Sequence, residues 1–177
     1  FTDLFGNAVA VPAAACACAA LGDTPRTMVD MCAGIGGMHL AAQQAFPGIR
    51  CVGYSEVKST AVACYQANFN VPSLGSAHTA RWPRAELVTA GFPCQPFSRS
   101  MHTQGVHRHH FFELVLQAID GTGANYAVFE NVTALLGRGA EQFEALREAL
   151  HARGFHTTYA VLNAADFGLP QTRRRVY

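Results

Sequence analysis

The stretch Thr27-Met28-Val29-Asp30-Met31-Cys32-Ala33-Gly34-Ile35-Gly36-Gly37 predicts how this chain folds. Its first five residues are mainly apolar and are expected to form a short strand, and a helix is expected at 38–46. Glycines between a strand and a helix let the backbone approach a ligand closely at the amino end of the helix. A glycine-rich turn is weak evidence by itself, so the stretch predicts a strand, a turn and a helix that can form one wall of a ligand site.

A second strand is expected at 51–55, and Glu56 follows it directly. An acidic residue about twenty positions after the glycines is well placed to accept hydrogen bonds from ribose hydroxyl groups. The same carboxylate can instead support the start of a helix expected at 57–69. The two roles are compatible, and both stay open at this point.

Strands and helices alternate along the rest of the chain. Further strands are expected at 86–90, 126–129, 155–162 and from Gln171 onward, and further helices at 111–119 and 141–153. The segment 71–84 has the composition of a loop. This alternation predicts an α/β fold with a mainly parallel sheet. Glu130 follows a strand, so it should lie at the same sheet edge as Glu56.

An alanine-rich helix is expected near the amino end, with Asn7 as its N-cap, Pro12 in or just after its first turn and Gly22 beyond its end. Free cysteines in alanine- or valine-rich runs are usually buried as small hydrophobic residues. We therefore expect burial of Cys16, Cys18, Cys51 and Cys64.

The loop Gly91-Phe92-Pro93-Cys94-Gln95-Pro96-Phe97-Ser98 is different. Two prolines fix the backbone on either side of Cys94, directly after an expected strand. A hydrophobic core does not require two prolines, a glutamine and a serine around a cysteine. Reactive groups of α/β enzymes lie just beyond the carboxyl ends of strands, so Cys94 is predicted to be chemically active.

The composition limits the classes of protein that fit. A chain of 177 residues with 50% hydrophobic and 14% charged residues should form one ordered domain, and its net charge of +1 gives little overall attraction to nucleic acid. Six cysteines without Cys-x-x-Cys pairs argue against a zinc site or a disulfide framework and favour a reducing, intracellular setting. No metal site is expected, because the histidines at 102, 107, 109 and 110 are irregularly spaced and suit a solvated loop better. The apolar stretch 8–21 is too short to span a membrane.

Five separated pieces of the chain, taken in order, resemble the motifs of the cytosine-5 DNA methyltransferase family. They are the glycine motif Asp30-Met31-Cys32-Ala33-Gly34-Ile35-Gly36-Gly37, the acidic motif Ser55-Glu56, the loop from Gly91 to Ser98, the motif Glu130-Asn131-Val132, and the paired arginines of Gln171-Thr172-Arg173-Arg174-Arg175. The resemblance implies a Rossmann-like S-adenosylmethionine-dependent methyltransferase fold, with a mainly parallel sheet and helices on both faces. It also implies methyl transfer from S-adenosylmethionine to C5 of a cytosine that is flipped out of duplex DNA.

The resemblance also implies roles for individual residues. The catalytic residues would be Cys94, Glu130, Arg173 and Arg175. The cofactor would contact Asn7, Ala8, Val9, Asp30, Cys32, Ala33, Gly34, Ile35, Gly36, Gly37, Glu56, Val57 and Pro93. DNA would contact Gln95, Ser98 and Arg99. The Cys94 thiolate would add to C6 of cytosine, Glu130 would hold the N3 edge and share a proton, and the arginines would hold the base and favour the thiolate.

The order of the motifs suggests how the domain is organised. Residues 1–22, with Gly6-Asn7-Ala8-Val9 and Pro12, resemble the motif that normally comes last in this family, but here it precedes the core at 27–177. The chain is therefore expected to be circularly permuted or to span two tandem copies, within one catalytic domain at 1–177. We also expect no target-recognition domain after Tyr177, so that a missing segment or a partner subunit would supply DNA reading.

The sequence departs from the family's pattern at two positions, and two alternative functions stay open. Cys32 stands where the family usually has phenylalanine over the adenosine, and no acid is evident near Gly75-Ser76-Ala77-His78, where one usually contacts the adenine. A transfer-RNA cytosine-5 methyltransferase is one alternative, although its Cys-Phe-Thr tripeptide is absent. A non-catalytic binding or regulatory subunit with the same fold is the other. The expected location is the nucleus of a eukaryote, or the cytoplasm for a bacterial or viral protein.

Overall fold

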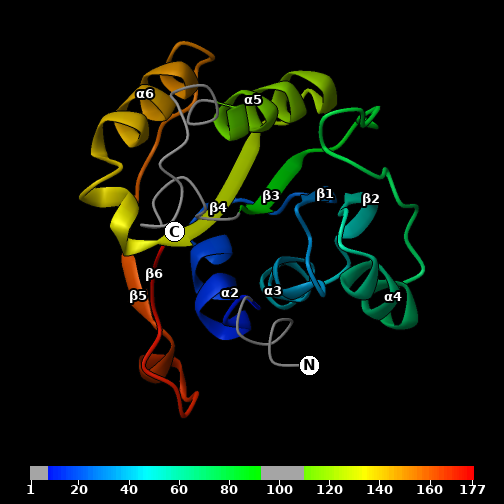
Figure 1. Cartoon of the computed structure of the whole chain (residues 1–177), viewed down its shortest axis with the longest axis horizontal. Helices are drawn as coiled ribbons and strands as arrows, with labels where there is room; N and C mark the ends of the chain where they lie inside the picture. The colour runs from blue at the N-terminus through cyan, green and yellow to red at the C-terminus, as the bar shows by residue number, and fades with distance from the viewer. Residues whose placement is uncertain (1–7, 93–109) are drawn as a thin grey trace.

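The computed structural model describes residues 8–92 and 110–177 (Figure 1). Its α-helices are α2 (Val11–Ala19), α3 (Gly37–Ala45), α4 (Ser59–Asn68), α5 (His110–Thr122) and α6 (Ala140–His151). Its strands are β1 (Thr27–Met31), β2 (Arg50–Ser55), β3 (Leu87–Gly91), β4 (Tyr126–Val132), β5 (Val161–Asn163) and β6 (Arg174–Val176). Two short 3₁₀ helices, η2 (Thr133–Leu136) and η3 (Ala164–Phe167), follow β4 and β5.

The six strands form one sheet in the order β2-β1-β3-β4-β6-β5. The pairs of β1 with β2, β1 with β3, and β3 with β4 are parallel, whereas β6 is antiparallel to both β4 and β5. The predicted α/β fold with a mainly parallel sheet is confirmed. Parallel strands place their carboxyl ends along one edge, so β1 to β4 all end on the same side of the molecule.

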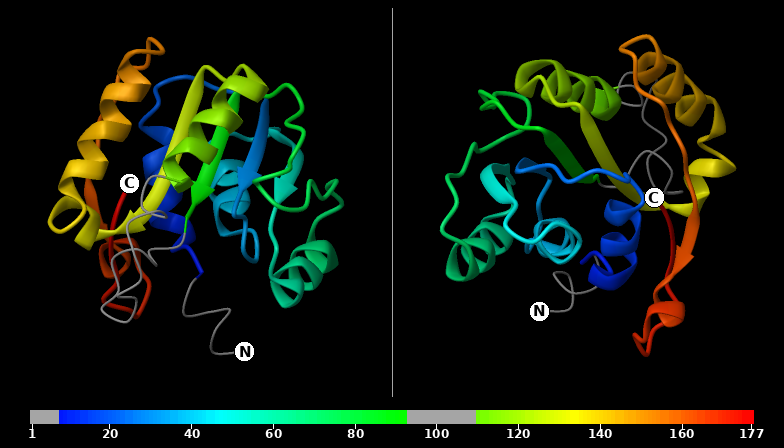
Figure 2. Two further views of the ribbon diagram at one scale, coloured as in Figure 1. Left: turned by 45° about the horizontal axis from the view of Figure 1, so that its top comes forward. Right: turned by 180° about the vertical axis from the view of Figure 1, so that it is seen from behind.

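Helices cover both faces of the sheet, with α5 and α6 on one face and α2 and α3 on the other (Figures 1 and 2). Successive strand residues point to opposite faces. Val29 and Val88 accordingly pack in the core beneath α5, and Met28 and Leu87 pack in the core beside α3. Because helices cover both faces of the sheet, nearly every residue of β1 and β3 is buried.

The first described helix differs from its prediction. It begins at Val11 with Ala10 as N-cap, and Pro12 lies in its first turn, so the predicted N-cap at Asn7 is wrong. Proline suits this position because its missing N–H would have no helical partner there. Cys18 is buried against the core as expected, but Cys16 is exposed.

Two strand boundaries also differ. β4 runs on to Val132, so Glu130 lies within a strand and not after one, because β6 pairs with Asn131 and Val132 and extends the ladder. The strand predicted at 155–162 forms only from Val161 to Asn163. These three residues pair with Val176, Arg175 and Arg174 of β6.

The segment between α4 and β3 is a loop, as predicted, but its first part lies against the sheet. Tyr54 N–H donates to the Pro72 carbonyl at 3.2 Å, and Leu74 N–H donates to the Tyr54 carbonyl at 2.8 Å. A Cβ at Gly53 would lie 2.9 Å from Leu74 Cδ1, so only glycine lets Leu74 lie over β2 there. Further along, Trp82 packs across the end of α5, where a Cβ at Gly121 would lie 3.1 Å from its side chain.

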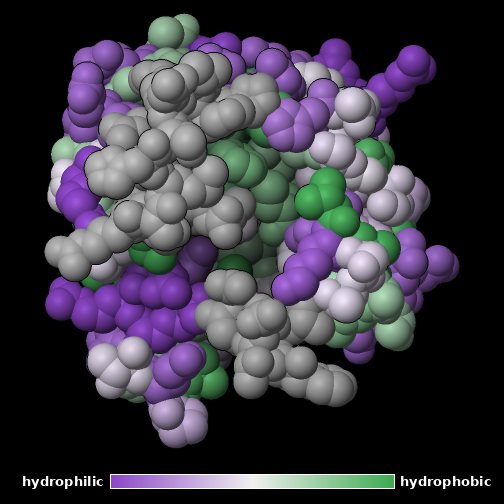
Figure 3. Space-filling model, in the orientation of Figure 1, coloured by the Kyte–Doolittle hydropathy of each residue, from purple (hydrophilic) through white to green (hydrophobic). Residues whose placement is uncertain are grey.

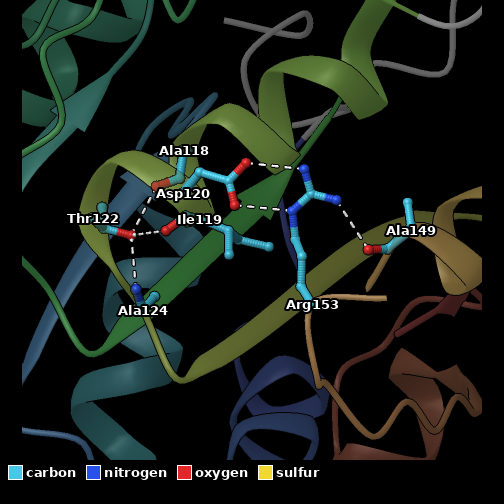
Figure 4. Close-up of polar contacts among 7 residues, drawn as sticks. All are labelled: Ala118, Ile119, Asp120, Thr122, Ala124, Ala149 and Arg153. Atoms are coloured by element: carbon cyan, nitrogen blue, oxygen red, sulfur yellow. Dashed lines mark hydrogen bonds and ion pairs between the residues drawn. The ribbon is translucent and has the colours of Figure 1, made fainter. Parts of the chain in front are cut away.

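A polar contact joins the ends of α5 and α6 (Figure 4). Arg153 donates from Nε and Nη2 to the two carboxylate oxygens of Asp120, both at 2.9 Å, and from Nη1 to the Ala149 carbonyl at 3.0 Å. Nearby, Thr122 Oγ1 donates to the Ala118 carbonyl at 2.7 Å and accepts from Ala124 N–H at 3.2 Å. These bonds satisfy backbone groups at the end of α5.

We expect Arg153→Ala to lower the free energy of unfolding by only about 0.2–1 kcal/mol, because exposed ion pairs are screened by water. The Arg153 and Asp120 side chains are 34% and 55% exposed. A double-mutant cycle with Asp120→Ala, followed by urea denaturation, measures the coupling. A coupling well above that range would show that the pair is more shielded from solvent than its exposure indicates.

Candidate active site

A pocket of about 440 Å³ opens at the carboxyl ends of the parallel strands. Figure 3 looks onto this face of the molecule, and a hollow with apolar walls is visible near its centre. The glycine turn after β1 and Glu56 lie at one end of the pocket, and Glu130 with Arg173 and Arg175 lies at the other. Residues that lie far apart in the sequence therefore face a single space.

Gly34 and Gly36 have different structural roles in the turn. Gly34 and Gly36 have φ values of 55° and 93°, which favour glycine over residues with a Cβ. A Cβ at Gly34 would meet nothing within 4 Å, and Gly34 lines the pocket. A Cβ at Gly36 would lie 2.3 Å from Phe69 Cε2 and is directed into the protein. Gly34 thus keeps the pocket wall open, whereas Gly36 makes room for the ring of Phe69.

Glu56 holds the glycine turn and lines the pocket at the same time. Its Oε2 accepts from Gly34 N–H at 2.9 Å, and its Oε1 accepts from Val57 and Lys58 N–H, both at 2.8 Å. The last two bonds organise the residues just before α4, whose N-cap is Lys58. The carboxylate therefore fixes the approach to the helix, and its position in the pocket wall remains compatible with the predicted contact to a ribose.

Asp30 lies below the pocket and not in its wall. Its side chain is fully buried, and its Oδ1 accepts a hydrogen bond of 2.8 Å from Thr89 Oγ1. Burial raises the pKa of this carboxyl group to about 7, although the hydrogen bond from Thr89 opposes the rise. Asp30 thus joins β1 to β3 under the glycine turn, and the structure does not bring it to the predicted cofactor contact.

Cys32 lines the pocket, as its predicted contact requires. It is the one non-glycine residue with a positive φ, 54°, among the residues that the structure describes. Its N–H donates to Ser55 Oγ at 3.3 Å, which ties the turn to the end of β2. Burial raises the pKa of its thiol to about 12, so Cys32 is neutral and acts as an apolar wall.

We expect Cys32→Phe to tighten binding of S-adenosylmethionine by about 0.5–1.5 kcal/mol, because an aromatic ring offers more stacking surface than a thiol. Isothermal titration calorimetry on both proteins measures the difference, and thermal unfolding checks that the variant is folded. An unchanged affinity in a folded variant would mean that residue 32 does not face the adenosine.

Glu130 is the acidic residue at the opposite end of the pocket. It is only 7% exposed, and its Oε1 lies 3.0 Å from Arg175 Nε and 4.0 Å from Arg173 Nη2. Burial raises the pKa of Glu130, and the two arginines oppose this rise. The antiparallel pairing of Val132 with Arg175 brings β6 alongside β4 and places the guanidinium groups near the carboxylate. Asn131 Oδ1 accepts from Val132 N–H at 2.8 Å.

The segment before α2 closes a third side of the pocket. Ala8 and Val9 both line it. A Cβ at Gly37 would lie 2.9 Å from Val9 Cβ, and a Cβ at Gly91 would lie 3.4 Å from Val9 Cγ2. Val9 therefore fits between the first turn of α3 and the end of β3, so residues from the start of the sequence complete the space framed by the glycine turn.

Most of the predicted site residues that the structure describes meet in this pocket. The predicted residues in its wall are Ala8, Val9, Cys32, Ala33, Gly34, Ile35, Gly37, Glu56, Val57, Glu130, Arg173 and Arg175. Asn7, Pro93, Cys94, Gln95, Ser98 and Arg99 lie outside the described residues. Within residues 8–92 and 110–177, no group of three or more histidine, cysteine, aspartate or glutamate side chains could hold a metal ion.

Sequence reasoning missed several lining residues. They include Lys58, Ala61, Ser76, Ala77, His78, Phe92, Phe111 and Leu114. Ser76, Ala77 and His78 lie in the segment where the family usually has an acid that contacts the adenine and where this sequence has none. Phe111 and Leu114 were predicted to be helical, but helical periodicity alone does not show which helix face meets a pocket.

Comparison with solved structures identifies the fold. The Dnmt2 methyltransferase of S. pombe superposes with a TM-score of 0.62 at 22% identity, covering 85% of this chain and 47% of that one. A precorrin-6y C5,15-methyltransferase from Geobacter metallireducens gives a TM-score of 0.58 at 17% identity, covering 85% of this chain and 75% of that one. The fold is thus the Rossmann-like fold of S-adenosylmethionine-dependent methyltransferases, as predicted.

The sequence identifies the family within that class. Residues 26–177 match the family described as C-5 cytosine-specific DNA methylase, and the chain belongs to this family. It is 34% identical over 157 residues to the type II methyltransferase M.NlaX of Neisseria lactamica, covering 85% of this chain and 50% of that protein. It is 30% identical over 158 residues to M.MspI of a Moraxella species, covering 84% of this chain and 37% of that protein. The chain therefore spans about half or less of the length of these curated relatives.

Proposed function

We propose that this protein is a DNA (cytosine-5)-methyltransferase that uses S-adenosylmethionine. The observation that carries the proposal is the single pocket that joins the glycine turn and Glu56 to the buried Glu130 with its two arginines. The end with the glycine turn and Glu56 has the features of a nucleoside site. The end with Glu130 can hydrogen-bond to a polar ring and exchange a proton with it. Membership of the C-5 cytosine-specific DNA methylase family supports the same reaction.

The residues present fit S-adenosylmethionine. The open side of Gly34 leaves room for a ligand against the backbone, and the pocket volume of about 440 Å³ suits a molecule of this size. Glu56 is placed to accept hydrogen bonds from the ribose, and Cys32, Val57 and Val9 supply apolar walls. When bound, the cofactor supplies a methyl group on a positively charged sulfur, which is a strong electrophile.

The chain's own residues prepare the cytosine to react. Cytosine C5 is a weak nucleophile, so we propose that the Cys94 thiolate adds to C6 and makes C5 electron-rich. Glu130 holds the N3 edge of the ring and shares a proton with it during that addition. Arg173 and Arg175 keep Glu130 in place and hold the base, and their positive charge favours the thiolate form of a nearby cysteine. C5 would then form a bond to the methyl group as the bond from that group to the cofactor's sulfur breaks. Loss of the C5 proton to a base would then restore the ring and release the Cys94 thiolate.

The environment of Glu130 suits its proposed role. Burial raises its pKa above the ordinary value for glutamate, and the two arginines oppose this rise. A carboxyl group whose pKa lies closer to the working pH transfers protons more effectively than an ordinary glutamate. Burial and the paired arginines are thus complementary parts of one acid–base centre.

DNA is the proposed partner. No helix among the described residues is long and apolar enough to cross a membrane. We propose that residues 1–22 and 27–177 form one catalytic domain, in which the motif at 1–22 is permuted or belongs to a tandem copy. We further propose that Gln95, Ser98 and Arg99 contact DNA and that an additional segment or a partner subunit reads the target sequence. Recognition of a target sequence requires contacts to base edges. A protein that acts on DNA is expected in a compartment of the cell that contains DNA.

Covalent trapping tests this function. Duplex DNA with 5-fluorocytosine should form a stable adduct with the protein when S-adenosylmethionine is present, and tritium from the labelled methyl group should enter ordinary duplex DNA. Cys94→Ala is the matched control and should form no adduct while still binding the cofactor. Trapping at another cysteine would refute the assignment of Cys94. Incorporation into transfer RNA but not DNA would favour the alternative substrate, and cofactor binding without any transfer would favour a non-catalytic module.

A further inference from the structure

Three residues lie where the two ends of the active-site pocket meet, and we call them the junction: Val9, Gly91 and Glu130. All three line the pocket. A Cβ at Gly91 would lie 3.4 Å from Val9 Cγ2 and 3.8 Å from Glu130 Oε2. A side chain at position 91 would therefore stand between the residue that borders the glycine turn and the carboxylate at the other end.

The reason for a glycine at position 91 is space and not backbone conformation. Gly91 is the last residue of β3, and it pairs with Glu130 of β4. It is not one of the described glycines with a positive φ, so its backbone would accept other residues. Glycine weakens a strand, and its presence in one often marks a place where a ligand approaches closely. Gly91 thus leaves the end of β3 without a side chain between Val9 and Glu130.

Val9 lies against the start of α3. Because α2 packs alongside α3 (Figure 1), the residues just before α2 are brought to this point. A Cβ at Gly37 would lie 2.9 Å from Val9 Cβ and 3.3 Å from Val9 N, so α3 supports Val9 from behind. A valine side chain is stiff at χ1, because it branches at Cβ. The Cγ2 methyl of Val9 is therefore a well-defined part of the pocket wall.

Glu130 directs its two carboxylate oxygens to different neighbours. Oε1 lies 3.0 Å from Arg175 Nε and 4.0 Å from Arg173 Nη2. Oε2 is the oxygen that a Cβ at Gly91 would meet. The arginines thus hold one oxygen of the carboxylate, and the other oxygen faces the junction.

Given the proposed function, the group that is transferred has to pass the junction, because the cofactor is assigned to the end near Glu56 and the cytosine to the end near Glu130. We infer that Val9 is a specificity-determining residue, whose side chain limits the transferred group to the size of a methyl group. A smaller residue at position 9 should open the junction to a larger alkyl group, and a methyl group added at Gly91 should narrow it. The substrate class that a smaller residue 9 would admit is an S-adenosyl sulfonium compound with an allyl group in place of the methyl group.

Transfer of an allyl group involves the same bond changes as transfer of a methyl group. C5 of the cytosine bound to Cys94 would form a bond to the CH₂ carbon of the allyl group as the bond from that carbon to sulfur breaks. The electron pair of the broken bond stays on sulfur, which becomes a neutral thioether. The C5 proton then passes to water acting as a base. The electrons of the C5–H bond restore the C5–C6 double bond, and the Cys94 thiolate is released.

Calorimetry without DNA tests the inference with three ligands that differ in the group on sulfur. They are S-adenosylhomocysteine, which carries no transferable group, S-adenosylmethionine and the allyl compound. The unmodified protein should bind the allyl compound about tenfold or more weakly than S-adenosylmethionine, because a few extra atoms in a tight apolar site cost at least this much. Val9→Ala should reduce this ratio to about threefold or less, on the same scale. Gly91→Ala should increase the ratio, and the affinity for S-adenosylhomocysteine should change least in both variants.

Transfer to duplex DNA gives a second measurement. In Val9→Ala protein, kcat/KM for allyl transfer relative to methyl transfer should rise by about tenfold or more. Val11→Ala is the matched control, because it removes the same two methyl groups from a residue that packs in the core and does not line the pocket. It should leave every ratio unchanged. Thermal unfolding shows whether each variant is folded, and Gly91→Ala tests the inference by itself if Val9→Ala does not fold.

An unchanged ratio of affinities in folded Val9→Ala or Gly91→Ala protein would overturn the inference and leave the proposed function in place. An equal change of that ratio in Val11→Ala would do the same, since the effect would then not come from the junction. If the unmodified protein bound none of the three ligands, the proposed function would fail, and the inference would fail with it.

Discussion

Replacing Glu130 by glutamine is expected to lower kcat for methyl transfer by about 100- to 10 000-fold, the range that a well-placed acid–base group contributes. Glutamine keeps the shape and can still hydrogen-bond to a ring edge, but it cannot take up or release a proton. The pocket end that we propose for the cofactor lies around Glu56, so binding of S-adenosylmethionine should change little. Steady-state kinetics with labelled cofactor and calorimetry on the same preparations measure the two quantities.

The electrostatic cost of this change has to be separated from its chemical effect. Glu130 neutralises Arg173 and Arg175, and removing one partner of a buried ion pair destabilises a protein by about 3–5 kcal/mol. Thermal unfolding therefore accompanies the kinetics, at a temperature where the variant is folded. Glu144→Gln on the exposed face of α6 is the matched control and should leave kcat unchanged. An undiminished kcat in folded Glu130→Gln protein would remove Glu130 from the proposed chemistry.

Gly36→Ala is expected to lower the free energy of unfolding by about 2–5 kcal/mol. The left-handed backbone at residue 36 accounts for about 1–2 kcal/mol of this loss, and overpacking against Phe69 accounts for about 1–3 kcal/mol. The φ value of 93° and the distance of 2.3 Å from the added Cβ to Phe69 Cε2 are the two observations behind the estimate. Urea denaturation of both proteins gives the difference directly.

The Gly34→Ala variant separates the effect of an added methyl group on stability from its effect on cofactor binding. Its φ of 55° gives a similar backbone cost, but its Cβ would meet no atom within 4 Å. We therefore expect a loss of only about 1–2 kcal/mol in stability, together with weaker cofactor binding, because the methyl group projects into the pocket. In the Gly36→Ala protein, Phe69→Ala should relieve the steric part of the loss. If Gly34→Ala destabilises as strongly as Gly36→Ala, the contact with Phe69 is not the cause.

The sequence predicts the framework of the fold well, because its strands are short apolar runs that end at polar residues or glycines. β1, β2 and β3 form within a residue or two of their expected limits for this reason. The start of α2 was missed, because N-cap preference is weaker than the packing of α2 against α3. The fate of residues 155–160 also depends on a partner strand, and no local pattern carries that information.

The candidate site was predicted in part for the same reason. Glycines and carboxylates at strand ends are visible in the sequence because parallel strands bring their carboxyl ends together. The meeting of Glu130 with Arg175 also depends on the antiparallel turn of β6, which periodicity does not reveal. Ser76 and His78 reach the pocket because the chain just before them pairs with the edge of β2, a contact that loop composition did not indicate.

Trp82 gives the molecule a built-in optical probe. It is the sole tryptophan of the sequence, and it lies across the end of α5 at Gly121, away from the residues that line the pocket. Its fluorescence should shift to longer wavelength when α5 separates from the neighbouring loop, because the half-buried indole then becomes hydrated. A ligand that binds without moving α5 should leave the emission unchanged. A change in emission on adding S-adenosylmethionine would therefore report that occupancy of the pocket is transmitted along α5, from Phe111 and Leu114 to its far end.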